Sequence, residues 1–240
     1  MRASTVPVLE VRDLSAGYGA REVVRGASLS IAPGEIVMLT GANGCGKTTL
    51  LDAICGFLPH KAATLRLLGG DVRARAACER ARMGLGRLFQ RGGVFCTLSV
   101  RQNLEIAGCG LAGGRVNWLH RTGSLLRWRA AETHEDSRRL LRAAGIPDAA
   151  RFAAGRLSFG QMRVLSLACV FARRARLLLL DEPYVGLGPA ARDVVRAAIV
   201  EGRAEGRGCL IVEHELSEIG AMSSRVLHMR GGVLEAGSSH

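Results

Sequence analysis

A glycine-rich stretch, GANGCGKTT at 41–49, has the composition of a loop that binds phosphate groups. Glycines let backbone amides curl around anionic oxygens without Cβ clashes, and a following helix offers its positive amino end to the anion. In such a loop Lys47 reaches the β and γ phosphates, and the Thr48 hydroxyl ligates Mg²⁺. We therefore predict a site for ATP and Mg²⁺, whose remaining phosphate-binding residues are Gly41, Asn43, Gly44, Cys45, Gly46 and Thr49.

Two adjacent acids follow a continuous apolar run much later in the chain. Residues 177–180 are all leucine and read as a buried strand that ends in Asp181 and Glu182. The carboxyl end of such a strand reaches the edge of the sheet at which the phosphate loop begins. Asp181 is then placed to hold Mg²⁺ through its water shell, and Glu182 to orient and polarise the attacking water as general base. The two acids predict a hydrolytic site.

The elements that position these motifs follow from hydrophobic periodicity. Apolar residues that alternate with polar ones, or form short continuous runs, predict strands, and an apolar stripe at helical spacing predicts a helix. The turn at Pro33 and Gly34 leads into the strand before the phosphate loop. The predicted strands are 8–14, 23–31, 36–40, 177–181 and 209–213, with a closing hairpin of 225–229 and 233–235; predicted helices include 47–56, 131–144 and 190–201.

The region 90–156 differs in texture from its surroundings, because glycines cluster there and its periodic segments are helical. Its clearest helix, 131–144, places Glu135 one turn before Arg139 and stops at Gly145, with Pro147 just beyond. We therefore predict a single domain, 1–240, whose core (1–89 and 157–240) carries an inserted helical lobe at 90–156.

Composition excludes several classes of protein. With 240 residues, of which 48% are hydrophobic, the chain can build a substantial core. No apolar stretch approaches the roughly 18 to 20 residues that cross a bilayer, and the amino terminus has no secretion signal, so we expect the cytosol. The seven cysteines show no CxxC spacing, which favours reduced, packed thiols. The net charge of +12 is spread along the chain with only 4% aromatics, so we expect no direct nucleic-acid binding.

A third motif, LSFGQ at 157–161, makes the combination specific. Ser158 is a good helix cap with a hydroxyl to offer, and Gly160 allows close approach of the backbone. The order of phosphate loop, serine-glycine turn and paired acids resembles the ATPase subunits of ATP-binding cassette (ABC) transporters. The resemblance implies an α/β P-loop NTPase core with a mostly parallel sheet, an N-terminal antiparallel β subdomain and an inserted α-helical lobe.

The resemblance also implies roles for individual residues. Tyr18 resembles the aromatic residue that stacks on adenine, although packing is the alternative for a single tyrosine. Gln90 resembles the glutamine that meets Mg²⁺ and the attacking water, and His214 the histidine that contacts the γ phosphate. The family's serine-glycine turn faces the nucleotide of a second subunit, and the matching residues are Ser158, Gly160 and Gln161. Two positions depart from the family pattern: Phe159 replaces the middle glycine of the turn, and Gly188 replaces an aspartate.

The family further implies partners: transmembrane permease subunits, a second ABC ATPase that is identical or related, and a periplasmic solute-binding protein, all at the cytoplasmic face of the inner membrane. Within the family, LSFGQ, GLGP at 186–189 and VEHEL at 212–216 are most similar to ATPases for uptake of branched-chain amino acids. Two alternatives stay open. One is a soluble ABC ATPase of repair, translation or iron-sulfur assembly, and the other is a nucleotide-dependent binding module with little turnover.

Overall fold

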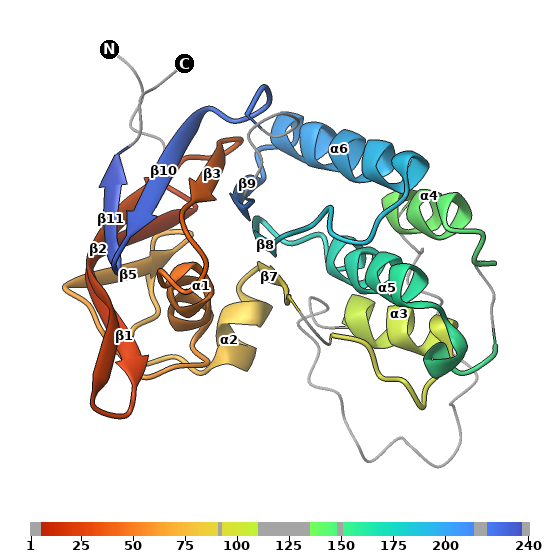
Figure 1. Ribbon diagram of the computed structural model, residues 1–240, viewed down its shortest axis with the longest axis horizontal. Helices are drawn as coiled ribbons and strands as arrows, with labels where there is room; N and C mark the ends of the chain where they lie inside the picture. The colour runs from red at the N-terminus through yellow and green to blue at the C-terminus, as the bar shows by residue number, and fades with distance from the viewer. Residues whose placement is uncertain (1–5, 91–92, 110–134, 148–150, 214–219, 237–240) are drawn as a thin grey trace. The chain divides into compact units, whose positions relative to one another are not determined.

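The structure is a computed structural model that describes residues 6–90, 93–109, 135–147, 151–213 and 220–236. The chain divides into two compact units. The first comprises Met1–Gln90, Ala175–Pro183 and Ala197–His240, and the second comprises Arg91–Arg174 and Tyr184–Arg196. All the strands of Figure 1 belong to the first unit.

The first sheet of this unit is antiparallel and is built mostly from the amino-terminal strands. Its order is β2-β1-β5-β6, and β4 pairs with β1. Along β1, buried Leu9, Val11 and Leu14 are separated by more exposed residues, which is the alternation of a strand with one face in the core. The strands are β1 (Leu9–Tyr18), β2 (Arg21–Ile31), β4 (His60–Lys61), β5 (Thr64–Leu67) and β6 (Gly70–Asp71).

The second sheet is parallel except at one edge, with the order β11-β10-β3-β9-β8-β7. Every residue of β3, β8 and β9 is buried, as expected for central strands covered on both faces. The antiparallel edge is the predicted closing hairpin of β10 and β11. The strands are β3 (Ile36–Thr40), β7 (Leu85–Leu88), β8 (Leu177–Asp181), β9 (Gly208–Val212), β10 (Arg225–Arg230) and β11 (Val233–Ala236). This mixture of sheets confirms the predicted α/β fold class.

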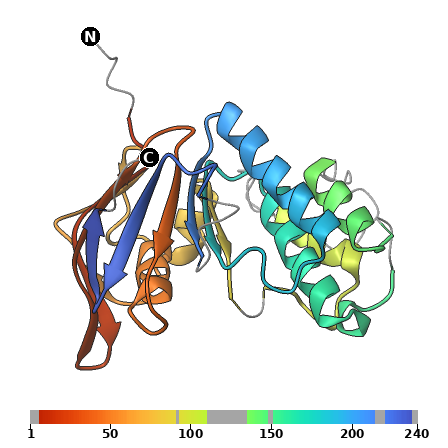
Figure 2. The ribbon, with the colours of Figure 1, turned by 45° about the horizontal axis from the view of Figure 1, so that its top comes forward.

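Helix α1 (Lys47–Cys55) joins the two sheets into one core. Its apolar residues Leu50, Leu51 and Ile54 belong to the same buried cluster as residues of both sheets. The helix lies between Gly46 and Gly56, within one residue of the predicted 47–56, and both glycines adopt the left-handed conformation. Figures 1 and 2 both show α1, in orange, among the strands of this unit, which also contains α2 (Ala77–Arg82).

The second unit is helical in its described residues. It contains α3 (Val100–Cys109), α4 (Glu135–Ala143), a short 3₁₀ turn (Ala154–Arg156), α5 (Phe159–Ala172) and the first half of α6 (Pro189–Ala204). Helix α5 is the centre of this unit, since both α3 and α4 pack against it (Figure 1). The Ser137 hydroxyl of α4 donates to the Ala168 carbonyl of α5 at 2.8 Å, and Leu140 and Leu141 are buried beside it.

Several boundaries differ from the predictions. Helix α4 ends before Gly145 as predicted, but residues 131–134 of the predicted helix lie outside the described residues. Helix α6 extends beyond both ends of the predicted 190–201. The segment 57–88 holds β4, β5, β6, α2 and β7, none of which was predicted, because strands of two to four residues carry too little periodicity.

The domain boundaries of the predicted lobe, 90–156, stay a prediction. The second compact unit also includes α5 and residues 184–196. Of the helices in the described ranges, none has both the length and the apolar character to cross a membrane.

Candidate functional site

The phosphate loop joins the end of β3 to the start of α1, the strand-loop-helix context that such a loop requires. Lys47 is only 7% exposed, although its side chain is charged. Its ammonium group donates hydrogen bonds to the carbonyl oxygens of Gly41, at 2.7 Å, and Ala42, at 3.0 Å. The loop therefore holds its own lysine in place, so the positive charge is fixed before any phosphate arrives.

The path of the loop depends on glycine at two positions. Gly41 and Gly46 have φ of 150° and 113°, in the region that other residues rarely adopt. A Cβ atom on Gly41 would collide with the carbonyl oxygen of Met229 and lie 2.8 Å from the Cys45 sulfur. The back of the loop is thus pressed against β10, and any side chain at Gly41 would push it forward.

Thr48 and Asp181 meet although they are far apart in the sequence. The Thr48 hydroxyl donates to Asp181 Oδ2 at 3.1 Å, and Asp181 is buried at the end of β8. A hydroxyl and a carboxylate are hard oxygen donors of the kind that Mg²⁺ prefers, so these residues fit the predicted metal. A bound Mg²⁺ neutralises charge that develops on the phosphate oxygens.

Glu182 and Gln90, two of the predicted catalytic residues, are also neighbours. The Gln90 amide donates to Glu182 Oε2 at 3.3 Å. Glu182 adopts a φ of 48°, a strained backbone conformation for a residue with a side chain, while its amide donates to the Val212 carbonyl at 3.0 Å. Such strain is found where the surrounding structure fixes a functional side chain, and it turns the backbone sharply directly after Asp181.

The sequence did not reveal two further charged residues at this edge, Arg87 and Asp52. The Arg87 guanidinium lies 3.1 Å from Asp181 and 3.2 Å from Asp52, and its side chain is only 5% exposed. Two signals were present: an arginine interrupts the apolar segment that ends at Gln90, and Asp52 stands one helical turn after Thr48. Charged residues in such positions read as solvent-exposed until the fold is known.

The other predicted residues of the first unit are placed as follows. Tyr18 ends β1 and is 55% exposed, so its ring is accessible for stacking. Asn43 and Gly44 are exposed, Cys45 is partly buried, and Thr49 is buried. His214 lies outside the described residues. The roles of all these residues stay predictions.

Burial separates the other described cysteines into two groups. Cys55, Cys169 and Cys209 are buried, whereas Cys78 and Cys96 are exposed. Burial raises the pKa of the Cys55 and Cys169 thiols to about 12, and it raises the pKa of Cys209 as well. The three buried thiols therefore stay protonated near neutral pH and are poor nucleophiles.

In the second unit the serine-glycine turn forms the amino end of α5. Ser158 is the helix cap: its hydroxyl accepts from the Gln161 amide at 3.2 Å, and the Gln161 side chain accepts from the Ser158 amide at 3.1 Å. Gln161 also donates to the Ala144 carbonyl at 3.3 Å, at the end of α4. The Gln161 side chain thus holds the turn together, while the exposed residues Ser158 and Phe159 border it.

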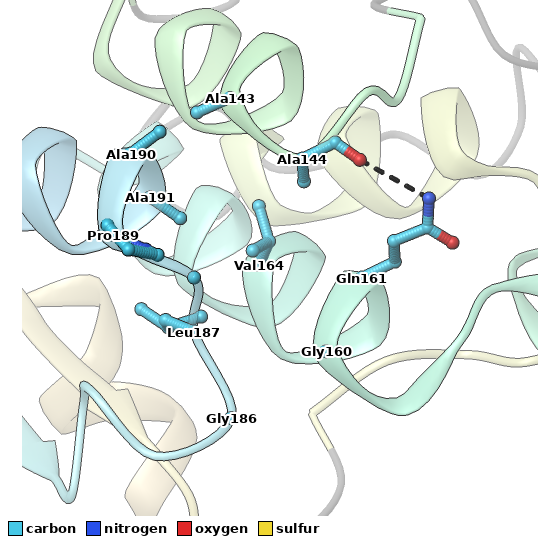
Figure 3. A pocket seen from close by; sticks show the side chains of 11 residues that line it. Ala143, Ala144, Gly160, Gln161, Val164, Gly186, Leu187, Pro189, Ala190 and Ala191 are labelled. Atoms are coloured by element: carbon cyan, nitrogen blue, oxygen red, sulfur yellow. Dashed lines mark hydrogen bonds between the residues drawn. The ribbon is translucent and has the colours of Figure 1, made fainter.

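A cavity of about 350 Å³ lies beside this turn (Figure 3). Apart from Gln161, its walls are small or apolar residues from the end of α4, from α5 and from the segment 186–191. The turn and that segment touch closely, because a Cβ on Gly160 would lie 2.9 Å from the Gly186 carbonyl oxygen. In contrast, a Cβ on Gly188 would meet nothing within 4 Å. Backbone and small side chains, rather than charged groups, shape this surface.

Comparison with known proteins identifies the family. Residues 24–185 match the ABC transporter family model, and the chain belongs to this family. It is therefore an ABC-type ATPase. Two solved structures confirm the fold: an ATP-binding subunit of an ABC transporter (TM-score 0.80, 23% identity, 97% of this chain and 90% of that one) and a nucleotide-free ATP-binding cassette (TM-score 0.75, 24% identity, 98% and 92%).

Curated relatives belong to systems with different solutes. The chain is 30% identical to the branched-chain amino acid transport ATP-binding protein BraF of Pseudomonas aeruginosa, over 94% of this chain and 89% of BraF. It is 34% identical to the lipopolysaccharide export ATP-binding protein LptB of Acidithiobacillus ferridurans, over 96% and 90%. It is 29% identical to the taurine import protein TauB of Escherichia coli O157:H7, over 94% and 80%. Family membership is thus shown, but no single solute is.

Proposed function

We propose that this chain hydrolyses ATP to drive uptake of branched-chain amino acids, or a related small solute, through a membrane permease. The observation that carries the hydrolytic part is the junction of Thr48, Asp181, Glu182 and Gln90 at one edge of the parallel sheet. BraF supports the solute class, as do LSFGQ and the GLGP segment at 186–189.

The first unit supplies the groups that act on ATP. Lys47 and the loop amides bind the β and γ phosphates, and Thr48 and Asp181 hold Mg²⁺. Glu182 accepts a proton from the attacking water, while the Gln90 amide orients the Glu182 carboxylate. Hydrogen bonds to neighbouring groups orient Lys47 and Glu182 before ATP arrives.

The second unit supplies the surface that meets another cassette. Ser158 and the backbone at Gly160 would face the γ phosphate held by a partner, which is identical or related to this chain. ATP then favours the closed pair because it binds that state more tightly, and hydrolysis lets the pair part. The permease converts this cycle into movement of solute at the cytoplasmic face of the inner membrane, and a periplasmic solute-binding protein delivers the solute.

A second candidate is export of an amphipathic lipid. The identity to LptB, 34%, is slightly higher than the identity to BraF. Both candidates use the same ATPase chemistry, because the membrane partner selects the solute. They differ in which chains accompany the ATPase and in the direction of transport.

The deciding experiment isolates the ATPase with its membrane partners from the source cells. We expect permease chains to accompany it, ATPase activity in vesicles to rise with solute-loaded binding protein, and labelled leucine to enter the vesicles. Stimulation by lipopolysaccharide instead of leucine would favour the export candidate. Recovery without any membrane chain, combined with stimulation by nucleic acid, would contradict both and favour a soluble ABC ATPase.

A further inference from the structure

Arg87 is a buried cation that two carboxylates share. Its Nη2 nitrogen donates to Asp52 Oδ1 at 3.2 Å and to Asp181 Oδ2 at 3.1 Å. All three side chains are largely withdrawn from solvent, with 5%, 21% and 2% of the arginine, Asp52 and Asp181 side chains exposed. Screening is weak in such surroundings, so this cation acts strongly on both acids.

Arg87 and Thr48 contact the same oxygen of Asp181. Asp181 Oδ2 accepts hydrogen bonds from both the Thr48 hydroxyl and the Arg87 guanidinium. Thr48 and Asp181 are the residues proposed to hold Mg²⁺. A cation at this oxygen neutralises the carboxylate and repels a divalent ion that approaches it. Arg87 and the metal therefore compete for Asp181.

Asp52 can relieve this competition. It stands four residues after Thr48 on α1 and binds the same nitrogen of Arg87 that Asp181 binds. Any shift of the guanidinium toward Asp52 leaves Asp181 more negative and therefore a better ligand. Arg87 and Asp52 therefore act in opposite directions on metal binding, because Asp52 draws the positive charge of Arg87 away from Asp181.

The rest of the Arg87 side chain makes contacts with its own strand and with Phe89. Its Nη1 donates to the Leu88 carbonyl at 2.9 Å, and its guanidinium carbon lies 5.5 Å from the centre of the Phe89 ring. Within the described part of the chain, its buried Nε nitrogen has no hydrogen-bond partner. The side chain is therefore anchored on β7 at a position from which the single nitrogen Nη2 reaches both acids.

We infer that Arg87 is a positioning residue that weakens Mg²⁺ binding at Asp181 until nucleotide phosphates supply further ligands, and that Asp52 sets the strength of this effect. The inference rests on the proposed function, because it assigns the metal of ATP hydrolysis to Thr48 and Asp181. As a consequence, divalent ions bind weakly at Asp181 when no nucleotide is present, and metal and nucleotide bind together.

The test measures Mn²⁺ binding to the nucleotide-free chain by electron paramagnetic resonance, with Mn²⁺ in place of Mg²⁺. Arg87→Gln should raise the affinity by at least about tenfold, the order expected for loss of a unit charge a few ångströms from a divalent ion even with the dielectric constant of water. Asp52→Asn should lower it about threefold, because Arg87 then pairs with Asp181 alone. Arg87→Lys should stay within about threefold of the wild type.

A matched control removes an arginine of equal charge elsewhere. Arg73→Gln deletes a surface arginine paired with Asp71, and solvent screening should leave Mn²⁺ affinity unchanged. Thermal melts monitor folding, since Arg87→Gln leaves two acids without their cation. If Arg87→Gln does not fold, Asp52→Asn decides the matter, because it leaves Arg87 paired with Asp181.

An unchanged or lower affinity in folded Arg87→Gln overturns the inference, and so does an unchanged or higher affinity in Asp52→Asn. A purely structural ion pair would alter stability in both variants without moving metal affinity in opposite directions. Failure of the wild type to retain Mn²⁺ even with ATP is a different result, because it would contradict the proposed function itself.

Discussion

The phosphate-loop region of the first unit and the serine-glycine turn of the second are built on opposite principles. In the first, the charged side chains of Lys47 and Asp181 are buried, Lys47 is bonded to backbone carbonyls, and Asp181 accepts from the Thr48 hydroxyl. In the second, the side chains of Ser158 and Gln161 bond within the turn itself, and the surface around them is formed by backbone and small residues.

This difference indicates a division of labour. The first region fixes its chemical groups in advance, which is the arrangement that stabilises charge in a transition state. The surface of the second region carries few charged groups, so it can act only by packing against a partner cassette whose bound nucleotide supplies the charge. Variants in the first region should therefore impair the chemical step or nucleotide binding. Variants in the second region should impair pairing with another cassette.

The largest effect is expected for Glu182→Gln. Loss of a positioned base should lower ATP turnover by about 10² to 10⁴-fold, while ATP binding stays near the wild-type value because Lys47 and the loop remain. Steady-state phosphate release and equilibrium binding of a fluorescent ATP analogue measure the two quantities. Glu22→Gln, an exposed glutamate of β2, serves as control and should leave both unchanged.

Equal losses of binding and turnover in Glu182→Gln would break the comparison, because the glutamate would then hold the loop together instead of acting on water. Wild-type turnover would remove Glu182 from the chemistry altogether.

The next largest loss of ATP turnover is expected on alkylation of Cys45. The thiol faces Gly41 within the phosphate loop, so an N-ethylmaleimide adduct should occupy space that phosphate needs and lower ATP turnover by more than about tenfold. ATP should protect, and Cys45→Ala should be insensitive. The assay uses a background in which Cys78, Cys96 and Cys109 are alanine. Unchanged inhibition in Cys45→Ala would place the reactive thiol elsewhere.

A smaller effect is expected in the second region, for Gly160→Ala. Its Cβ would lie 2.9 Å from the Gly186 carbonyl, and overpacking of this kind usually costs about 1 to 3 kcal/mol. We expect turnover to fall about tenfold with ATP binding to the single chain unchanged, because only the surface offered to a partner cassette is displaced. Light scattering on the Glu182→Gln background tests the loss of ATP-dependent pairing directly.

Gly188→Ala is the matched control, since a Cβ there meets nothing within 4 Å and its φ is not left-handed. It should pair and turn over like the wild type. If Gly160→Ala and Gly188→Ala behave alike, the close contact at Gly186 has no part in assembly.

Sequence predicts the elements next to the motifs well. The strands β3 and β8 have the predicted limits, and α1 differs by one residue, because a continuous buried run or an apolar stripe between glycines leaves few alternatives. The proximity of Thr48 and Asp181 can also be predicted, because the carboxyl ends of parallel strands lie at the same edge of a sheet.

The burial of two arginines could not be predicted from the sequence. Arg80 is 1% exposed and donates to the carbonyls of Ala53 and Ile54 at the end of α1, and Arg87 lies between two acids. From the sequence alone an arginine reads as solvent-exposed, and only the tertiary fold brings helix-end carbonyls or acids to it. The positive φ of Glu182 is equally invisible, because strain depends on the surroundings and not on residue type.

The smallest effect is expected for Phe159→Gly, which restores the glycine usual in the family. Phe159 is 71% exposed and its ring lies against Gly186, so removal of the ring loses little buried area. We expect turnover within about threefold of the wild type and a loss of stability of no more than about 1 kcal/mol, from the lower helix propensity of glycine. Phe159→Ala separates loss of the ring from gain of flexibility, and ATPase assays with thermal melts measure both. A tenfold loss of turnover in both variants would mean that the ring itself contacts nucleotide or partner, and the second region would then contribute a side chain as well as a shape.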